Sequence, residues 1–77
     1  MDTVNELTLL LIYLTSWEED GGLKKLLRSW KGYRFEALNE LTDKGYLFDN
    51  KGAKSVYLTE EGIRFAEQLK RKYSIQP

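Results

Sequence analysis

The stretch at residues 41–62, LTDKGYLFDNKGAKSVYLTEEG, constrains the fold more than any other part of this chain. A helical pattern runs into Gly45, which stands where a left-handed C-terminal cap is typical. Two short runs rich in aromatic and β-branched residues follow, at 46–48 and 55–58, with a polar connection between them. A new helix is expected to begin at Thr59, a good N-cap residue. The stretch therefore predicts a β-hairpin between two helices.

Alternation along the hairpin predicts that Leu47, Val56 and Leu58 point inward. A two-stranded hairpin is not stable alone, so it must lean on the helices. Gly62 falls in the first turn of the following helix, where glycine is unfavourable. Its presence predicts close packing at that turn.

The first helix is expected over about residues 3–15, where Thr3 and Glu6 have capping-box spacing. A stripe of apolar side chains recurs there at helical spacing, formed by Val4, Leu7, Leu11 and Leu14. Other apolar residues fall outside the stripe, so the helix is apolar on two sides. It is either a central helix covered by neighbours on both sides, or it makes a homodimer contact through Leu9, Ile12 and Tyr13.

Between this helix and Gly45 the pattern predicts two more helices. An acidic, glycine-containing turn at 18–22 leads to a short second helix over 23–29. A third helix spans about 34–44, with Phe35, Leu38 and Leu41 as its buried seam, helped by Ala37. Its outward side chains are then Glu36, Asn39, Glu40 and Asp43. We therefore expect a mainly α fold with a small β-hairpin (α+β).

Two segments, LNELTDKGYL and KSVYLTEEG, resemble the core signature of winged-helix transcription regulators such as the MarR and PadR groups. The matching positions are Leu38, Leu41 and Gly45, then Leu58, Thr59 and Gly62. The whole chain, including SWKGYRFEALNEL, also resembles a small prokaryotic winged-helix family with no assigned function. The resemblance implies a winged helix-turn-helix in the order helix, helix, helix, strand, wing, strand, helix. It implies one domain over residues 1–73, and we expect a frayed tail at 74–77.

In such regulators the third helix enters the DNA major groove and the wing touches the backbone. The charge placement agrees in part, because residues 23–35 hold five basic side chains and no acid. The candidate DNA-contacting residues are Lys24, Lys25, Arg28, Lys31, Arg34, Asn39, Lys51 and Lys54. A solvated, solubilising surface explains the same charges. The net charge of zero and the acids Glu36, Glu40 and Asp43 on the third helix count against base reading.

The absent residue types narrow the function further. The chain has no cysteine and no histidine, which removes thiolate sites, the commonest metal ligand and the usual general base. We therefore expect no enzyme activity, no cofactor, no metal and no small-molecule substrate. No apolar run is long enough to span a membrane, and no targeting segment is evident, so we expect a cytoplasmic protein. Two functions stay open: a DNA-associated winged helix, and a protein-interaction or homodimerisation module that does not read DNA.

Overall fold

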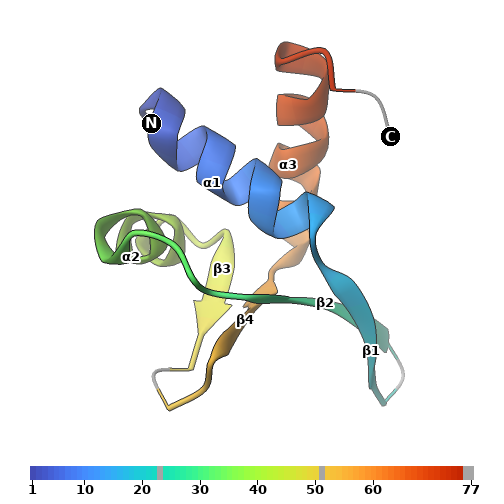
Figure 1. The fold of residues 1–77 in the computed structure, drawn as a ribbon. Coiled ribbons are helices and arrows are strands. Elements are labelled where there is room, and N and C mark those ends of the chain that lie inside the picture. The colour runs from blue at the N-terminus through green and yellow to red at the C-terminus, as the bar shows by residue number, and fades with distance from the viewer. Residues whose placement is uncertain (23, 51, 76–77) are drawn as a thin grey trace.

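Single helices alternate with pairs of strands along the chain (Figure 1). The structure is a computed structural model that describes residues 1–22, 24–50 and 52–75, with only the backbone of residues 24 and 25. Its elements, in order, are α1 (Thr3–Leu14), β1 (Trp17–Gly21), β2 (Lys24–Trp30), α2 (Phe35–Asp43), β3 (Leu47–Asp49), β4 (Ser55–Leu58) and α3 (Glu60–Lys72). The strands form one antiparallel sheet in the order β1-β2-β4-β3. The helices lie toward one end of the sheet, and both hairpin tips project from the other.

The predicted winged helix-turn-helix is wrong, and so is its order of elements. The observed order is α-β-β-α-β-β-α, and residues 17–21 and 24–30 form two paired strands where a turn and a short second helix were expected. A helix of seven residues is marginal by itself, because nucleation is costly. As strand β2, the same segment pairs with β1 on one side and with β4 on the other. The hydrogen bonds of these two strand pairs stabilise the segment more than a short isolated helix would. The hairpin that was expected to be a wing, β3 with β4, is half of a four-stranded sheet.

Arg28 shows why the β2 segment prefers the sheet. Its guanidinium donates to both carboxylate oxygens of Glu19 on β1, at 2.8 and 3.0 Å, and to Ser55 Oγ on β4 at 2.6 Å. It also lies 5.2 Å from the ring centroid of Tyr57, directly opposite on β4. One side chain thus joins three strands, and a helix could not present it to both neighbours.

The signals around Gly45 are confirmed. Gly45 has φ +82° and ends α2, with its amide bonded to the Thr42 carbonyl and the Tyr46 amide bonded to the Leu41 carbonyl. This pair of bonds is a Schellman motif, which satisfies carbonyls that the helix leaves free. The chain can then reverse directly into β3. The hairpin side chains Leu47, Val56 and Leu58 are buried, as alternation predicted.

Gly62 packs as its position predicted. Thr59 caps α3 by accepting from the Gly62 amide at 2.9 Å. A Cβ atom on Gly62 would lie 2.0 Å from the carbonyl oxygen of Tyr46. The same carbonyl accepts from the Thr59 amide at 3.1 Å, so it is held in place. Only glycine allows α3 to start this close to the entry of β3.

The core forms where α1, α2 and α3 meet the inner side of the sheet. Its largest fully buried apolar side chains are Leu9, Ile12, Leu41, Leu69 and Val56. The prediction for the third helix was partly wrong, because Phe35 is 68% exposed while Ala37 takes the buried place beside Leu38 and Leu41. Phe35 opens α2 and lies off its inner side. Within the predicted tail, the Ile75 amide donates to the Lys70 carbonyl, and residues 76 and 77 lie outside the described residues.

Replacing Gly62 by alanine should lower the free energy of unfolding by roughly 1–3 kcal/mol, because the new methyl group would force backbone apart. Gly32→Ala is the matched control, since a Cβ there meets nothing within 4 Å. Urea denaturation of both variants measures the difference. Equal midpoints for the two variants would contradict the close approach of α3 to Tyr46.

Candidate protein-interaction surface

Helix α1 has two apolar sides, and only one of them is buried. Leu9 and Ile12 are fully buried in the core. The side chains on the opposite side remain 39–49% exposed: Val4, Leu7, Leu11 and Leu14. We call these four residues the α1 stripe. Positions three and four apart lie on one face of a helix, so the stripe is continuous.

This arrangement corrects the predicted homodimer residues. Leu9 and Ile12 are enclosed by their own chain, so they cannot meet a second copy. Tyr13 is half-buried, and its hydroxyl donates to Glu67 on α3. The exposed apolar side of α1 is the stripe that sequence periodicity marked first.

Two polar contacts with α3 hold α1 in this rotation. Glu6 is buried and accepts from Lys72 Nζ at 2.7 Å and from the Tyr73 hydroxyl at 2.6 Å. Two turns later, the Tyr13 hydroxyl donates to the Glu67 carboxylate. Both contacts lie on the same flank of α1. Turning the stripe inward would break them, and it would leave the Glu6 carboxylate without its partners.

These contacts also set the protonation of the groups. Hydrogen bonds from Lys72 and Tyr73 lower the pKa of Glu6, which keeps its carboxylate charged. The hydrogen bond to Glu67, with burial, raises the pKa of Tyr13 to about 12. At neutral pH Glu6 is therefore an anion and Tyr13 a neutral donor. Each group has the form that its contact with α3 requires.

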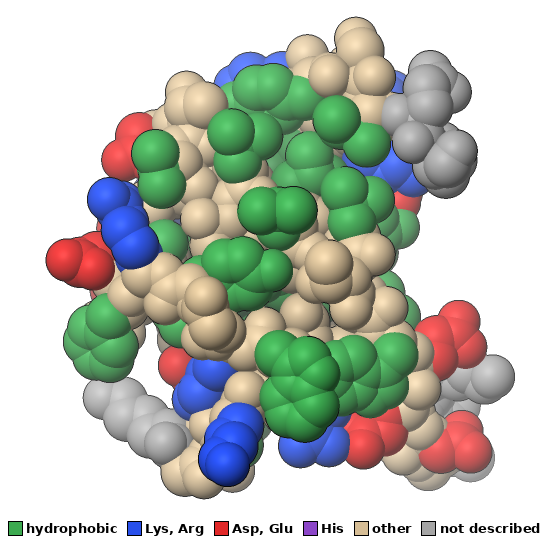
Figure 2. All heavy atoms as spheres, in the orientation of Figure 1, with side chains coloured by type: hydrophobic (Ala, Val, Ile, Leu, Met, Phe, Trp, Pro, Cys, Tyr) green, Lys and Arg blue, Asp and Glu red, His purple; other side chains and the backbone are tan. Residues whose placement is uncertain are grey.

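The apolar surface continues past the end of α1. Trp30 on β2 is 63% exposed, and its ring lies 5.2 Å from the ring of Trp17 on β1. The hydroxyls of Thr15 and Ser29, 3.2 Å apart, join this part of β2 to the end of α1. Figure 2 shows hydrophobic side chains spread over α1 and over the strands beneath it on this face. The stripe and the tryptophan pair are thus neighbouring parts of one apolar face.

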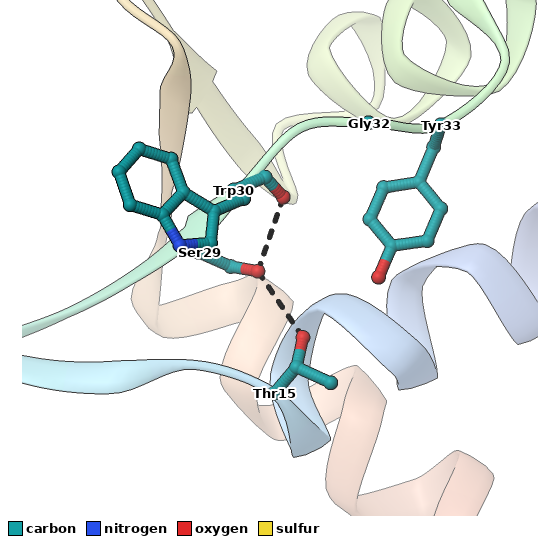
Figure 3. A pocket seen from close by; sticks show the side chains of 5 residues that line it. All are labelled: Thr15, Ser29, Trp30, Gly32 and Tyr33. Atoms are coloured by element: carbon teal, nitrogen blue, oxygen red, sulfur yellow. Dashed lines mark hydrogen bonds between the residues drawn. The ribbon is translucent and has the colours of Figure 1, made fainter.

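An open pocket of about 320 Å³ lies beside Trp30. Its lining residues are Thr15, Ser29, Trp30, Gly32 and Tyr33. The indole and the phenol ring stand on either side, with the two hydroxyls between them (Figure 3). Gly32 leaves its part of the wall without a side chain.

The hydroxyls at the pocket already have partners inside the protein. Thr15 Oγ1 donates to the Leu11 carbonyl at 2.7 Å, and Ser29 Oγ donates to the Trp30 carbonyl at 3.2 Å. Ser29 is also almost completely buried. What an incoming group meets is mainly aromatic surface, so the pocket favours an apolar occupant.

Among the candidate DNA-contacting residues that the structure describes, Arg28 and Lys31 are engaged within the protein. Arg28 is bound to Glu19 and Ser55, and Lys31 Nζ donates to Asp49 at 2.6 Å and to the Asn50 carbonyl at 3.2 Å. Both cations therefore tie strands together. The Lys31–Asp49 pair is mostly enclosed, with 18% and 15% of the two side chains exposed.

Three other candidates are exposed and come from different parts of the chain. Arg34 precedes α2, Asn39 lies on its outer face, and Lys54 lies before β4. The acids Glu36 and Asp43 are exposed on the same helix as Asn39. The side chains of Lys24 and Lys25, and all of Lys51, lie outside the described residues.

Sequence reasoning missed the residues that form the pocket. The local signal that could have found them is the pair of aromatic residues, Trp30 and Tyr33, on either side of Lys31-Gly32. Nothing in the local sequence indicated that Glu6 meets Lys72 and Tyr73, because these residues are 66 and 67 positions away. Such a contact follows only from the packing of the two terminal helices.

Within residues 1–22, 24–50 and 52–75, no cluster of three or more acidic side chains is placed to hold a metal ion. Across the same part of the chain, none of the helices has both the length and the apolar character needed to cross a bilayer.

A family described as a domain of unknown function, DUF6429, matches residues 1–76. Neither a curated protein nor a solved structure matches the chain. The family match confirms the expectation of a family with no assigned function. It gives no support to the resemblance to MarR- and PadR-type regulators.

Replacing Glu6 by glutamine should lower the melting temperature at neutral pH, because the Lys72 ammonium loses its anionic partner. The folded-state pKa of Glu6 lies below its ordinary value of 4.5, so its contribution is complete above that value. The contribution is lost as the pH falls through the lowered pKa. Melting curves of both proteins between pH 7 and pH 2 should therefore converge in acid.

Asp20→Asn, an exposed change on β1, is the control and should match the wild type throughout. A melting difference between wild type and Glu6→Gln that persists undiminished at pH 2 would rule out the charge of Glu6 as its cause.

Proposed function

This chain belongs to the DUF6429 family, and we propose that it acts as a non-catalytic protein-interaction domain that forms a homodimer through the α1 stripe. The observation that supports this most is the exposure of Val4, Leu7, Leu11 and Leu14 on one side of a well-formed helix. Contiguous exposed apolar surface of this kind marks interaction sites in soluble proteins. Covering it removes apolar area from water, which favours association.

The spacing of the stripe suits a second copy of the same helix. Intervals of three, four and three residues are the a and d positions of two heptads, where helices interlock side by side. Two heptads alone make a small contact. The exposed Trp30, next to the end of α1, extends the apolar area available to a partner.

The charges are also compatible with self-association. The stripe itself contains no ionisable side chain, and the chain has twelve basic and twelve acidic residues. Molecules with zero net charge do not repel their own copies, and near-zero net charge promotes association. A strongly charged partner such as nucleic acid gains little from this face.

The DNA-binding hypothesis is less well supported. Its basic residues Arg28 and Lys31 are neutralised by Glu19 and Asp49. Phosphate contacts dominate the affinity of proteins for DNA, and they need cations that are free to reach the backbone. We therefore do not propose DNA reading as the function.

The proposal predicts that wild type elutes and scatters light as a dimer, at twice the 9.0 kDa mass of the chain. The double variant Leu7→Glu/Leu11→Glu should be monomeric or bind itself at least about tenfold more weakly, a change of about 1.4 kcal/mol. Both positions are exposed, so the fold should survive, and circular dichroism checks this.

Phe48→Glu is the matched control, because Phe48 is an exposed apolar residue on β3 and outside the stripe. This variant should remain dimeric. A wild-type protein that stays monomeric at millimolar concentration would overturn the proposed function.

Fluorescence anisotropy with labelled duplex DNA tests the rejected function. At low salt we expect no saturable binding by the wild type, because Arg28 and Lys31 are engaged within the protein. Binding that weakens with salt, and weakens again in Arg34→Gln/Lys54→Gln, would restore the DNA hypothesis.

A further inference from the structure

We infer that the two copies pair with their α1 helices antiparallel, and that Met1 of one copy enters the pocket between Trp30 and Tyr33 of the other. This inference rests on the homodimer proposed above and specifies its geometry. It assigns an occupant to the pocket, an apolar side chain of a second copy.

The stripe is symmetric under reversal of the helix. Val4 and Leu14 lie five residues to either side of position 9, and Leu7 and Leu11 lie two residues to either side. With a two-fold axis at this position, Val4 of each copy faces Leu14 of the other, and Leu7 faces Leu11. The same contacts then form twice, as an isologous interface requires.

The helix ends favour the antiparallel direction over the parallel one. A helix carries partial positive charge at its N-terminus and partial negative charge at its C-terminus. The last turn of α1 contains no basic residue to offset the negative end. An antiparallel copy brings its positive end alongside, whereas a parallel copy would place like ends together.

The same register brings Met1 to the pocket. Met1 precedes Val4 by three residues, and Val4 faces Leu14, so Met1 lies beyond Leu14 of the second copy. Thr15, the next residue after Leu14, lines the pocket. Met1 is 40% exposed and lies outside the core, so its side chain is free to leave its own surface.

The chemistry of the pocket suits methionine. Its side chain is flexible and apolar, and its sulfur makes favourable contacts with aromatic rings such as those of Trp30 and Tyr33. The pocket hydroxyls of Thr15 and Ser29 are bonded within the protein, so an apolar occupant displaces no hydrogen bond between side chains. A volume of about 320 Å³ is ample for one side chain.

Cysteine cross-linking tests the direction of the helices, and the chain has no cysteine of its own. Val4→Cys and Leu14→Cys proteins are prepared separately and then mixed under mild oxidation. We expect the mixed disulfide dimer to form many-fold faster than either protein with itself. Faster coupling of Val4→Cys with itself would show parallel helices and overturn the inference.

The outcome separates the two proposals. Light scattering on the wild type decides whether a dimer exists at all, which tests the proposed function. A stable dimer in which Val4→Cys and Leu14→Cys do not couple would leave the homodimer standing and refute only its antiparallel register.

Oxidation of Met1 by dilute hydrogen peroxide tests the pocket, because Met1 is the only methionine in the chain. Mass spectrometry should show oxidation several-fold slower at concentrations that favour the dimer than at those that favour the monomer. Gly32→Leu fills the pocket without a clash at Cβ, so it should abolish this protection. Gly32→Ala is too small to fill it and should behave as wild type.

Equal oxidation rates in monomer and dimer would overturn the placement of Met1. Trp17 and Trp30, the only tryptophans, lie beside the pocket and give an independent reading. Their emission should shift to the blue on dimer formation, and less so in Gly32→Leu.

Discussion

The pairing of β2 with β4 is the contact on which the rest of the structure depends. It aligns Arg28, Ser29 and Trp30 with Tyr57, Val56 and Ser55, and thereby joins two separate hairpins into one sheet. Without it, the segment after the first helix would have no partner beyond its own hairpin. With it, Ser29 is buried beside Thr15, and Trp30 is left exposed at the end of α1. The pocket exists because of this register.

The same pairing decides what the basic residues do. Arg28 lies between Glu19 and Tyr57, so its charge is used to join three strands. Lys31, one residue past the end of β2, reaches Asp49 at the end of β3. Two of the five basic residues between positions 23 and 35 thus make bonds within the fold. The surface that remains for a partner is the apolar side of α1, and this is why self-association is the better supported function.

Local signals predicted the first helix and the second half of the chain, and they failed for the segment between α1 and α2. Gly45, Thr59 and Gly62 mark helix ends through their own backbone angles and capping bonds. These features depend on few neighbours, so the sequence predicted the hairpin and the last helix correctly. The leucines of residues 23–27 fit a helix as well as a strand over so short a run. Only the partner strand, 25 or more residues further along the chain, resolved the choice. Glu6 and the pocket residues were missed for the same reason, because their partners are distant in sequence.

The sequence by itself determined that α1 would be helical and apolar on two sides, that the chain would reverse after Gly45, and that no histidine or cysteine was present for catalysis. Only the tertiary structure decided which side of α1 is buried. Large apolar side chains lie on both sides, so apolar character alone does not choose between them. The bonds of Glu6 to Lys72 and Tyr73 form only in the rotation in which Leu9 and Ile12 enter the core and the stripe faces out.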